Sequence, residues 1–322
     1  MQYPTLFIGL GGTGEKILAQ IKTMLLNNSP VLESYRFLCI DVDESRYYRE
    51  ERPIKPLSFE EFLNIGFYYP TFVERICEQD DNFNKWWYDC NEWLFFQRTS
   101  GTGTYGDNRS STLLFSNLNR RIRRVCWYYD LLQGKNGRLP NIDRFLGTGF
   151  QPKRVVVIAS LCGGTGSGLF LDIGYFLKSV FPESLTLGIL TVPEIYPSAS
   201  RFLDYFRGNA YVTIRELEHF AKSRYEFGPE NHHLVFDNVE PFCEYWLIGN
   251  EEFVSPKYDL PVYFTDIAKT VTEGVIPSGS LGNKAMPMPL SEHIQHWKSW
   301  EQSFQEIIRK GEFSLYISRE LD

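Results

Sequence analysis

The chain has 322 residues, of which 43% are hydrophobic, 16% aromatic and only 23% charged, a composition that predicts a sizeable core and excludes intrinsic disorder. Its net charge of −7 disfavours generic binding to a nucleic-acid backbone, which needs an excess of lysine and arginine on at least one face. No apolar run reaches the roughly 18 residues of a membrane helix, and no basic signal region precedes the first apolar run. With six scattered cysteines that lack CxxC spacing, we expect a cytoplasmic protein without a membrane span.

The first part of the sequence predicts a parallel βαβ unit. Residues Thr5–Gly9 form a short apolar run typical of a strand, and apolar residues at helical spacing from Ile17 to Leu25 predict a helix after a glycine-rich turn. A second buried strand is expected over Tyr35–Asp41, ending in an acidic residue. Two strands joined by a helix favour a parallel pair with a right-handed crossover.

The segment from about residue 50 to residue 100 is expected to be a helical, aromatic-rich insertion on the sheet. Its aromatic residues form either a local satellite core or an exposed patch that docks a partner, and the sequence does not separate the two. A glycine-rich loop over Ser100–Gly106 and a helix over Ser110–Trp127 follow. Four arginines lie at helical spacing in that helix: Arg120, Arg121, Arg123 and Arg124. We interpret them as a solvated helix face or an ion-pair network.

The rest of the chain continues the alternation of strands and helices. The expected strands are Arg154–Cys162, Thr186–Val192 and Glu244–Ile248. The expected helices are Leu169–Leu177, Asn209–Ala221 and Val262–Val275. This alternation is typical of a three-layer α/β fold with a mostly parallel sheet and helices on both faces.

Two glycine-rich turns each lie between a predicted buried strand and a predicted helix. The first, Gly9–Gly14, matches GxGxxG, and Asp41 ends the next strand, which is the pattern of a dinucleotide site. It is a near miss for a P-loop, because Glu15–Ile17 stands where Gly-Lys-Ser/Thr is required. A dinucleotide enzyme does not need the second turn, Gly163–Gly168. Two such turns at the carboxyl edge of one parallel sheet can instead converge on a polyphosphate.

The second turn also carries a family resemblance. Cys162–Gly168 (CGGTGSG) resembles the GGGTGSG-like signature loop of the tubulin and FtsZ superfamily and departs from it only at Cys162. The other segments follow in that family's order over about residues 3–275, with a large insertion between residues 49 and 100. The opening Gly-Leu-Gly-Gly-Thr-Gly is similar to that of divergent bacterial tubulin-like proteins. The resemblance implies GTP or GDP with Mg²⁺ as ligands, and protein partners or self-association.

The resemblance also implies a set of site residues. The phosphates are expected on three glycine loops, at Gly11, Gly12, Thr13 and Gly14, at Gly101, Thr102 and Gly103, and at Gly163, Gly164, Thr165, Gly166 and Ser167. Asp43, with Asp41 behind it, is expected to organise Mg²⁺ and its waters, since a hard cation prefers carboxylate oxygens. The remaining candidates are Asp204 for the ribose, Asn250 for the guanine edge, and Tyr263 and Asp266 for the base.

The resemblance ends near residue 275. Residues 276–322 are too few for the family's second domain and are expected to form a linker and a C-terminal helical tail. We assign no catalytic residue, because in this family the catalytic acid reaches the nucleotide of the next subunit. We therefore expect a GTP-binding subunit of a filament or of a multi-protein assembly, in which any hydrolysis is completed by a neighbouring chain.

Two alternatives stay open. The first is an NAD-dependent oxidoreductase built on Gly9–Gly14 and Asp41. The second is a tubulin-fold scaffold that binds no nucleotide, because glycines at strand–helix turns can also serve close packing alone.

Overall fold

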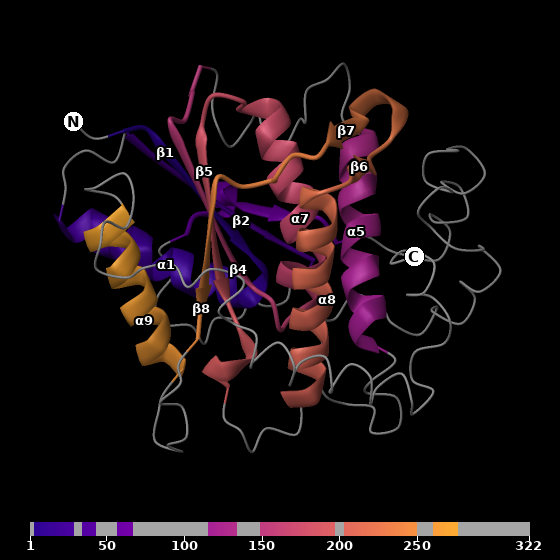
Figure 1. Ribbon diagram of the computed structural model, residues 1–322. Helices are drawn as coiled ribbons and strands as arrows, with labels where there is room; N and C mark the ends of the chain where they lie inside the picture. Colours follow the sequence, from indigo (N-terminus) through magenta and orange to yellow (C-terminus); the bar gives the residue numbers. More distant parts are fainter. Residues whose placement is uncertain are drawn as a thin grey trace.

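The computed structural model describes residues 3–28, 34–42, 57–66, 115–133, 149–196, 203–249 and 260–275, and the statements below concern these residues. A six-stranded sheet lies at the centre, in the order β3-β2-β1-β4-β5-β8, and every neighbouring pair is parallel. Its strands are β1 (Thr5–Leu10), β2 (Tyr35–Asp41), β3 (Phe62–Asn64), β4 (Arg154–Ser160), β5 (Leu185–Thr191) and β8 (Glu244–Ile248). Helices cover both faces of the sheet (Figure 1), so the expected three-layer α/β fold is confirmed.

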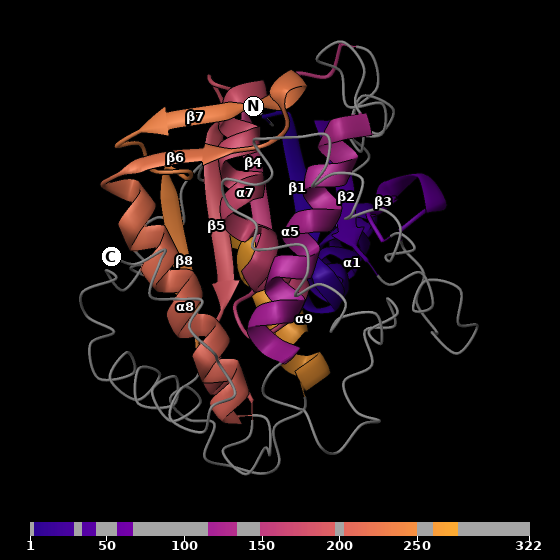
Figure 2. The same ribbon diagram turned by 90° about the vertical axis from the view of Figure 1, so that its right-hand side faces the viewer.

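The helices divide between the two faces of the sheet (Figure 1). On one face lie α1 (Gly11–Asn28) and α9 (Leu260–Thr270), which continues as a π-helical turn, Val271–Val275. On the other face lie α5 (Phe115–Gln133), α7 (Gly164–Val180) and α8 (Leu203–Ala221). Figure 2 shows an antiparallel ribbon of β6 (Arg224–Phe227) and β7 (Leu234–Asp237) across one end of this second layer. Short 3-10 turns lie at Phe59–Glu61 (η2), Pro193–Ile195 (η4) and Glu230–His232 (η5).

The sheet separates two hydrophobic cores, because successive strand residues point to opposite faces. In β4, Val155 and Val157 belong to the core under α5, α7 and α8, whereas Val156 and Ile158 belong to the core under α1 and α9. A strand that is buried on both faces carries a continuous apolar run rather than an alternating one. All seven residues of β4 are buried, which explains why this strand is so clear in the sequence.

Most predicted elements are present, with differences at their ends. The strands over 35–41 and 244–248 have the predicted bounds, whereas β4 ends at Ser160 because the next residues form the turn into α7. Helix α8 begins at Leu203, six residues before the predicted Asn209–Ala221. The strands β3, β6 and β7 were not predicted. Most of the expected insertion and the whole expected tail lie outside the described residues, and no described helix is long and apolar enough to cross a membrane.

The order in which the chain adds strands to the described sheet changes sides once. From β1 the chain adds β2 and then β3 on one side, and afterwards β4, β5 and β8 on the other. At the carboxyl ends of the adjacent strands β1 and β4, the chain therefore leaves toward opposite faces, into α1 and α7. In open α/β sheets such a reversal leaves a crevice in which ligands bind.

Candidate functional site

The two predicted glycine turns contact each other at this reversal point. Gly11 has a φ of 70°, in the left-handed region that favours glycine, and it begins α1 directly after β1. A Cβ on Gly11 would lie 3.1 Å from the Cβ of Thr165, in the first turn of α7. The N-termini of the two helices thus lie side by side, although they are far apart in the sequence.

Several glycines of the two turns have a packing role. A Cβ on Gly14 would lie 2.6 Å from the carbonyl oxygen of Ile158, so α1 packs with its backbone directly against β4. A Cβ on Gly166 would overlap the carbonyl oxygen of Ser160, and one on Gly168 would lie 2.6 Å from the carbonyl oxygen of Arg120. Gly12, Thr13 and Gly163 are half-buried, so they remain accessible to a ligand at this edge.

The two helix N-termini direct positive partial charge toward this edge of the sheet. The first N–H groups of an α-helix have no intrahelical acceptor, and the helix dipole places positive partial charge there. Neither α1 nor α7 has an acidic residue in its first turn, and Gly163 provides no side-chain cap for α7. Two such N-termini that meet at one crevice can bind an anion with backbone N–H groups.

Asp41 holds the second glycine turn to the end of β2. The hydroxyl of Thr165 donates a hydrogen bond of 2.7 Å to Oδ1 of Asp41, and the N–H of Val42 donates one of 2.8 Å to the same oxygen. The Asp41 side chain is only 5% exposed. Its carboxylate thus lies next to the first turn of α7, while Asp43 lies outside the described residues.

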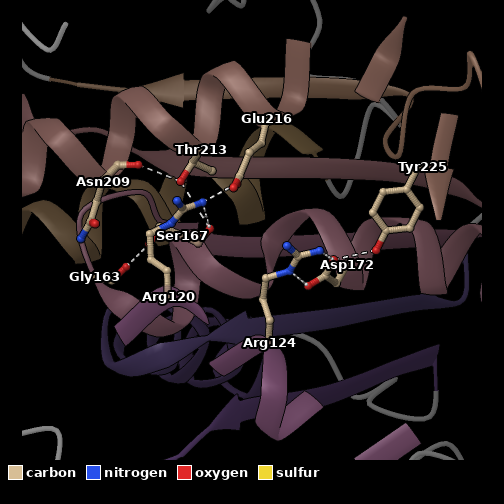
Figure 3. Close-up of polar contacts among 9 residues, drawn as sticks. All are labelled: Arg120, Arg124, Gly163, Ser167, Asp172, Asn209, Thr213, Glu216 and Tyr225. Carbon is tan, nitrogen blue, oxygen red and sulfur yellow. Dashed lines mark hydrogen bonds and ion pairs between the residues drawn. The ribbon is translucent and has the colours of Figure 1, made fainter. Parts of the chain in front are cut away.

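Helices α5 and α8 support the second turn from behind (Figure 3). The amide nitrogen of Asn209 donates a 2.9 Å hydrogen bond to the carbonyl oxygen of Cys162. The carbonyl oxygen of Ser167 accepts from Arg120 at 3.1 Å and lies 3.3 Å from the hydroxyl of Thr213. The hydroxyl of Ser167 donates to the carbonyl oxygen of Gly163, so it closes the first turn of α7. Sequence reasoning named Ser167 as a site residue but assigned no role at the site to Arg120, Asn209 or Thr213.

Tyr196 is a second group that sequence reasoning missed. It follows η4 at the exit of β5, and its hydroxyl lies near the side chains of Thr13 and Ser160. Burial raises the pKa of Tyr196 to about 12, so its hydroxyl is neutral at physiological pH. Its ring lies 4.4 Å, centroid to centroid, from that of Phe206. Tyr196 therefore lies between the exit of β5, the first glycine turn and the end of β4, which leads into the second turn.

Cys162, the departure from the signature loop, is fully buried. Burial raises the pKa of its thiol, and the nearby Glu194 raises it further, so the thiol stays protonated and unreactive. Cys39 and Cys126 are also buried, whereas Cys243 is exposed, and none of these four described cysteines is joined to another in a disulfide.

The remaining candidates lie at different places. Asp204 is exposed in the first turn of α8, and Asp266 is exposed on α9. Tyr263 is only 6% exposed and packs in the core between α1, α9 and the sheet. Gly101, Thr102, Gly103 and Asn250 lie outside the described residues. The structure thus brings together the first turn, the second turn and Asp41, and the roles of the other candidates stay predictions.

Two arginines of α5, Arg120 and Arg124, form ion pairs. Arg120 is 3% exposed and pairs with Glu216 of α8. Arg124 binds Asp172 of α7 through two hydrogen bonds, of 2.7 and 2.9 Å (Figure 3). For these two residues the ion-pair interpretation of the sequence is confirmed, and the solvated-face interpretation is wrong.

Comparisons with known proteins identify similar chains. A family model described as "Tubulin like" matches residues 6–272. CetZ2 from Haloferax volcanii, solved as a GTPγS-bound protofilament, has a TM-score of 0.48 and 13% identity, over 87% of this chain and 61% of that chain. TubZ from Clostridium botulinum phage c-st has a TM-score of 0.47 and 11% identity, over 85% and 60%. CetZ from Methanosaeta thermophila has a TM-score of 0.47 and 12% identity, over 85% and 52%. The chain thus spans less than two thirds of these structures, and no curated protein matches it.

Proposed function

Because this chain belongs to the tubulin-like family, we propose that it binds GTP or GDP with Mg²⁺ at the carboxyl edge of its sheet. We further propose that it acts as a nucleotide-dependent subunit of a filament or multi-protein assembly in the cytoplasm. In the proposed division of the chain, residues 1–275 form the nucleotide domain, with an insertion at about 50–100, and residues 276–322 form a linker and helical tail.

One observation carries the proposal: the N-termini of α1 and α7 meet where the strand order reverses, with Gly11 against Thr165. A chain of phosphates carries several negative charges close together. Two adjacent helix N-termini likewise bring backbone N–H donors and positive partial charge close together. A dinucleotide oxidoreductase needs only the first of these turns. The convergence of both therefore favours a nucleoside polyphosphate over NAD.

The residues near this edge fit a hydrated divalent cation. Mg²⁺ keeps several waters and is usually bound through one or two carboxylates together with the phosphates. Oδ1 of Asp41 already accepts two hydrogen bonds, which suits a carboxylate that acts through bound water rather than directly. Asp43, two residues further on, is the proposed direct ligand. The cation would offset charge on the phosphates.

The base and any hydrolysis depend on residues outside the described part of the chain. Asn250 follows β8, whose carboxyl end lies beside that of β5, and we propose that its amide reads the guanine edge. Among the similar structures, CetZ1 from Haloferax volcanii is a GDP-bound monomer, whereas CetZ2 is a GTPγS-bound protofilament. These relatives support guanine specificity and self-association. Hydrolysis, where it occurs, is proposed to need an acid from a neighbouring chain.

Nucleotide binding is tested first by denaturing the freshly purified protein and identifying any released nucleotide by chromatography and mass. Titration with a fluorescent GTP analogue and Mg²⁺ follows, for the wild type, Gly11→Asp and Gly149→Asp. Both substitutions place a carboxylate at a left-handed glycine, but Gly149 has open space around it and lies near the amino end of β4. We expect Gly11→Asp to lose binding and Gly149→Asp to keep it.

Two further variants test the remaining assignments: Gly164→Asp and Asp43→Ala are both expected to lose Mg²⁺-dependent affinity. The proposal fails if no guanine nucleotide is released or taken up. A change in nicotinamide fluorescence on titration would then favour the oxidoreductase, and no ligand at all would favour the scaffold.

A further inference from the structure

Arg120 is a buried cation at the back of the second glycine turn. It lies on α5, is 3% exposed, and donates from Nη2 to the carbonyl oxygen of Ser167 at 3.1 Å (Figure 3). The same nitrogen contacts the carboxylate of Glu216 on α8, whose side chain is 19% exposed. A single guanidinium thus connects α5, α7 and α8 at the first turn of α7.

This position is electrostatically unfavourable for a cation. The N-terminus of α7 already carries positive partial charge, and cations are normally favoured at the opposite end of a helix. Glu216 compensates the charge, but the Nε of Arg120 finds no acceptor among the described residues. Buried donors without an acceptor are uncommon and need an explanation. Arg120 is held here by the contacts of its Nη2 with Ser167 and Glu216, so its position is explained by the groups that it connects and not by satisfaction of all its donors.

Two features of the chain make the contact between Arg120 and Ser167 possible. A Cβ on Gly168 would lie 2.6 Å from the carbonyl oxygen of Arg120, so the backbones of α5 and α7 are in direct contact here. The Thr213 hydroxyl of α8 donates a 2.8 Å hydrogen bond to the carbonyl oxygen of Asn209 and lies 3.3 Å from the same Ser167 oxygen, so two helices contact one carbonyl group. The position of the second turn is therefore set by α5 and α8 and not by its own sequence alone.

We propose that Arg120 is a positioning residue of the nucleotide site. It holds the second glycine turn in the geometry that aims its N–H groups at a phosphate. This inference rests on the proposed function, since it concerns the same site.

Arg124 offers a matched control on the same helix. It is also a buried arginine that binds α7, but its partner Asp172 lies five residues beyond Ser167 and is 0% exposed. Asp172 also accepts a 2.6 Å hydrogen bond from the hydroxyl of Tyr225. Loss of Arg124 therefore removes a buried ion pair between α5 and α7 away from the glycine turn.

The experiment compares wild type, Arg120→Met and Arg124→Met at a temperature at which all three are folded. The first readout is the affinity for a fluorescent GTP analogue with Mg²⁺, and the second is hydrogen exchange of the amides of residues 163–168 without nucleotide. We expect Arg120→Met to weaken affinity by about tenfold, the loss of one charge-assisted hydrogen bond, and to speed exchange in the turn. Arg124→Met is expected to have a clearly smaller effect on both readouts, since Arg124 binds Asp172 and makes no hydrogen bond to Ser167 among those that hold the turn.

Equal effects of the two substitutions on both readouts would overturn the proposal. If Arg120→Met does not fold, Arg120→Lys replaces it. Lysine keeps the charge but cannot bind Ser167 and Glu216 together as the forked guanidinium does, so we expect a smaller loss of affinity. Wild-type affinity and wild-type exchange in Arg120→Lys would overturn the proposal. If the wild type binds no guanine nucleotide, the proposed function falls, while the exchange comparison still decides whether Arg120 positions the turn.

Discussion

The hydroxyl of Thr165 donates a 2.7 Å hydrogen bond to the carboxylate of Asp41, although the two residues are 124 positions apart in the chain. Strand β1 lies between the strands that lead to these residues, so the bond passes across the end of the central strand. It joins the acidic end of β2 to the first turn of α7. The geometry of the candidate site is therefore a property of the assembled sheet edge and not of one loop.

Thr165→Val is expected to destabilise the protein by about 1–3 kcal/mol, because it keeps the shape of the side chain but leaves the buried Asp41 carboxylate with one donor fewer. Urea unfolding measures this change. Thr165→Ser keeps the hydroxyl and serves as the control. If valine and serine unfold at the same urea concentration, the bond does not contribute to stability.

Gly168→Ala is expected to cost about 1–3 kcal/mol, because the added methyl group meets the backbone of α5 at Arg120, 2.6 Å away, and forces the helices apart. Thermal unfolding followed by circular dichroism measures the loss. At Gly249 the nearest obstacle is a side-chain methyl of Val192, which can move, so Gly249→Ala is the matched substitution. A similar Tm for both variants would contradict the close packing of α5 on α7.

Arg124→Met is expected to cost about 3–5 kcal/mol, because it leaves the carboxylate of Asp172, which is 0% exposed, without its cation. The double variant Arg124→Met with Asp172→Leu removes both charges and is expected to recover most of the loss, since a buried ion pair is often replaceable by apolar side chains. A guanidinium chloride titration of both single variants and the double variant gives the coupling energy. Additive losses would show that the two residues do not act as a pair.

The raised pKa of Tyr196 predicts that the free energy of unfolding falls at alkaline pH. Its pKa is raised from 10.0 to about 12 by burial, so its contribution to stability is fully present below pH 10.0 and is lost as the pH rises toward 12. The sign follows because the unfolded chain loses this proton first and is thereby favoured. The unfolding free energy of the wild type should therefore fall more steeply above pH 10 than that of Tyr196→Phe. Parallel pH profiles from urea titrations would refute this assignment.

The sequence predicts the sheet well because parallel strands buried on both faces are continuous apolar runs. Arg154–Ser160 is recognisable for this reason, as is the helix that follows a glycine turn. Strand β3 is not recognisable in the sequence because it has only three residues and, within the described part of the chain, pairs only with β2. Its stability comes from a neighbour and not from a local pattern.

The candidate site is only partly predictable for the same physical reason. Glycine turns between strands and helices are local features, so the two turns are visible in the sequence. The contact between Arg120 and Ser167 joins residues 47 positions apart, and an arginine at helical spacing is usually solvated. Tyr196 likewise reaches Thr13 across the fold, and no local signal marks it.

The single exposed thiol among the described cysteines, Cys243, has a practical consequence. It precedes β8, and its N–H donates to the carbonyl oxygen of Thr186 at the amino end of β5, which is the edge of the sheet opposite the glycine turns. In a variant in which Cys77 and Cys90, outside the described residues, are replaced by serine, a maleimide dye attached at Cys243 would stand away from the nucleotide edge. Energy transfer between donor- and acceptor-labelled copies would then report association of chains, with the dye clear of the phosphate-binding turns.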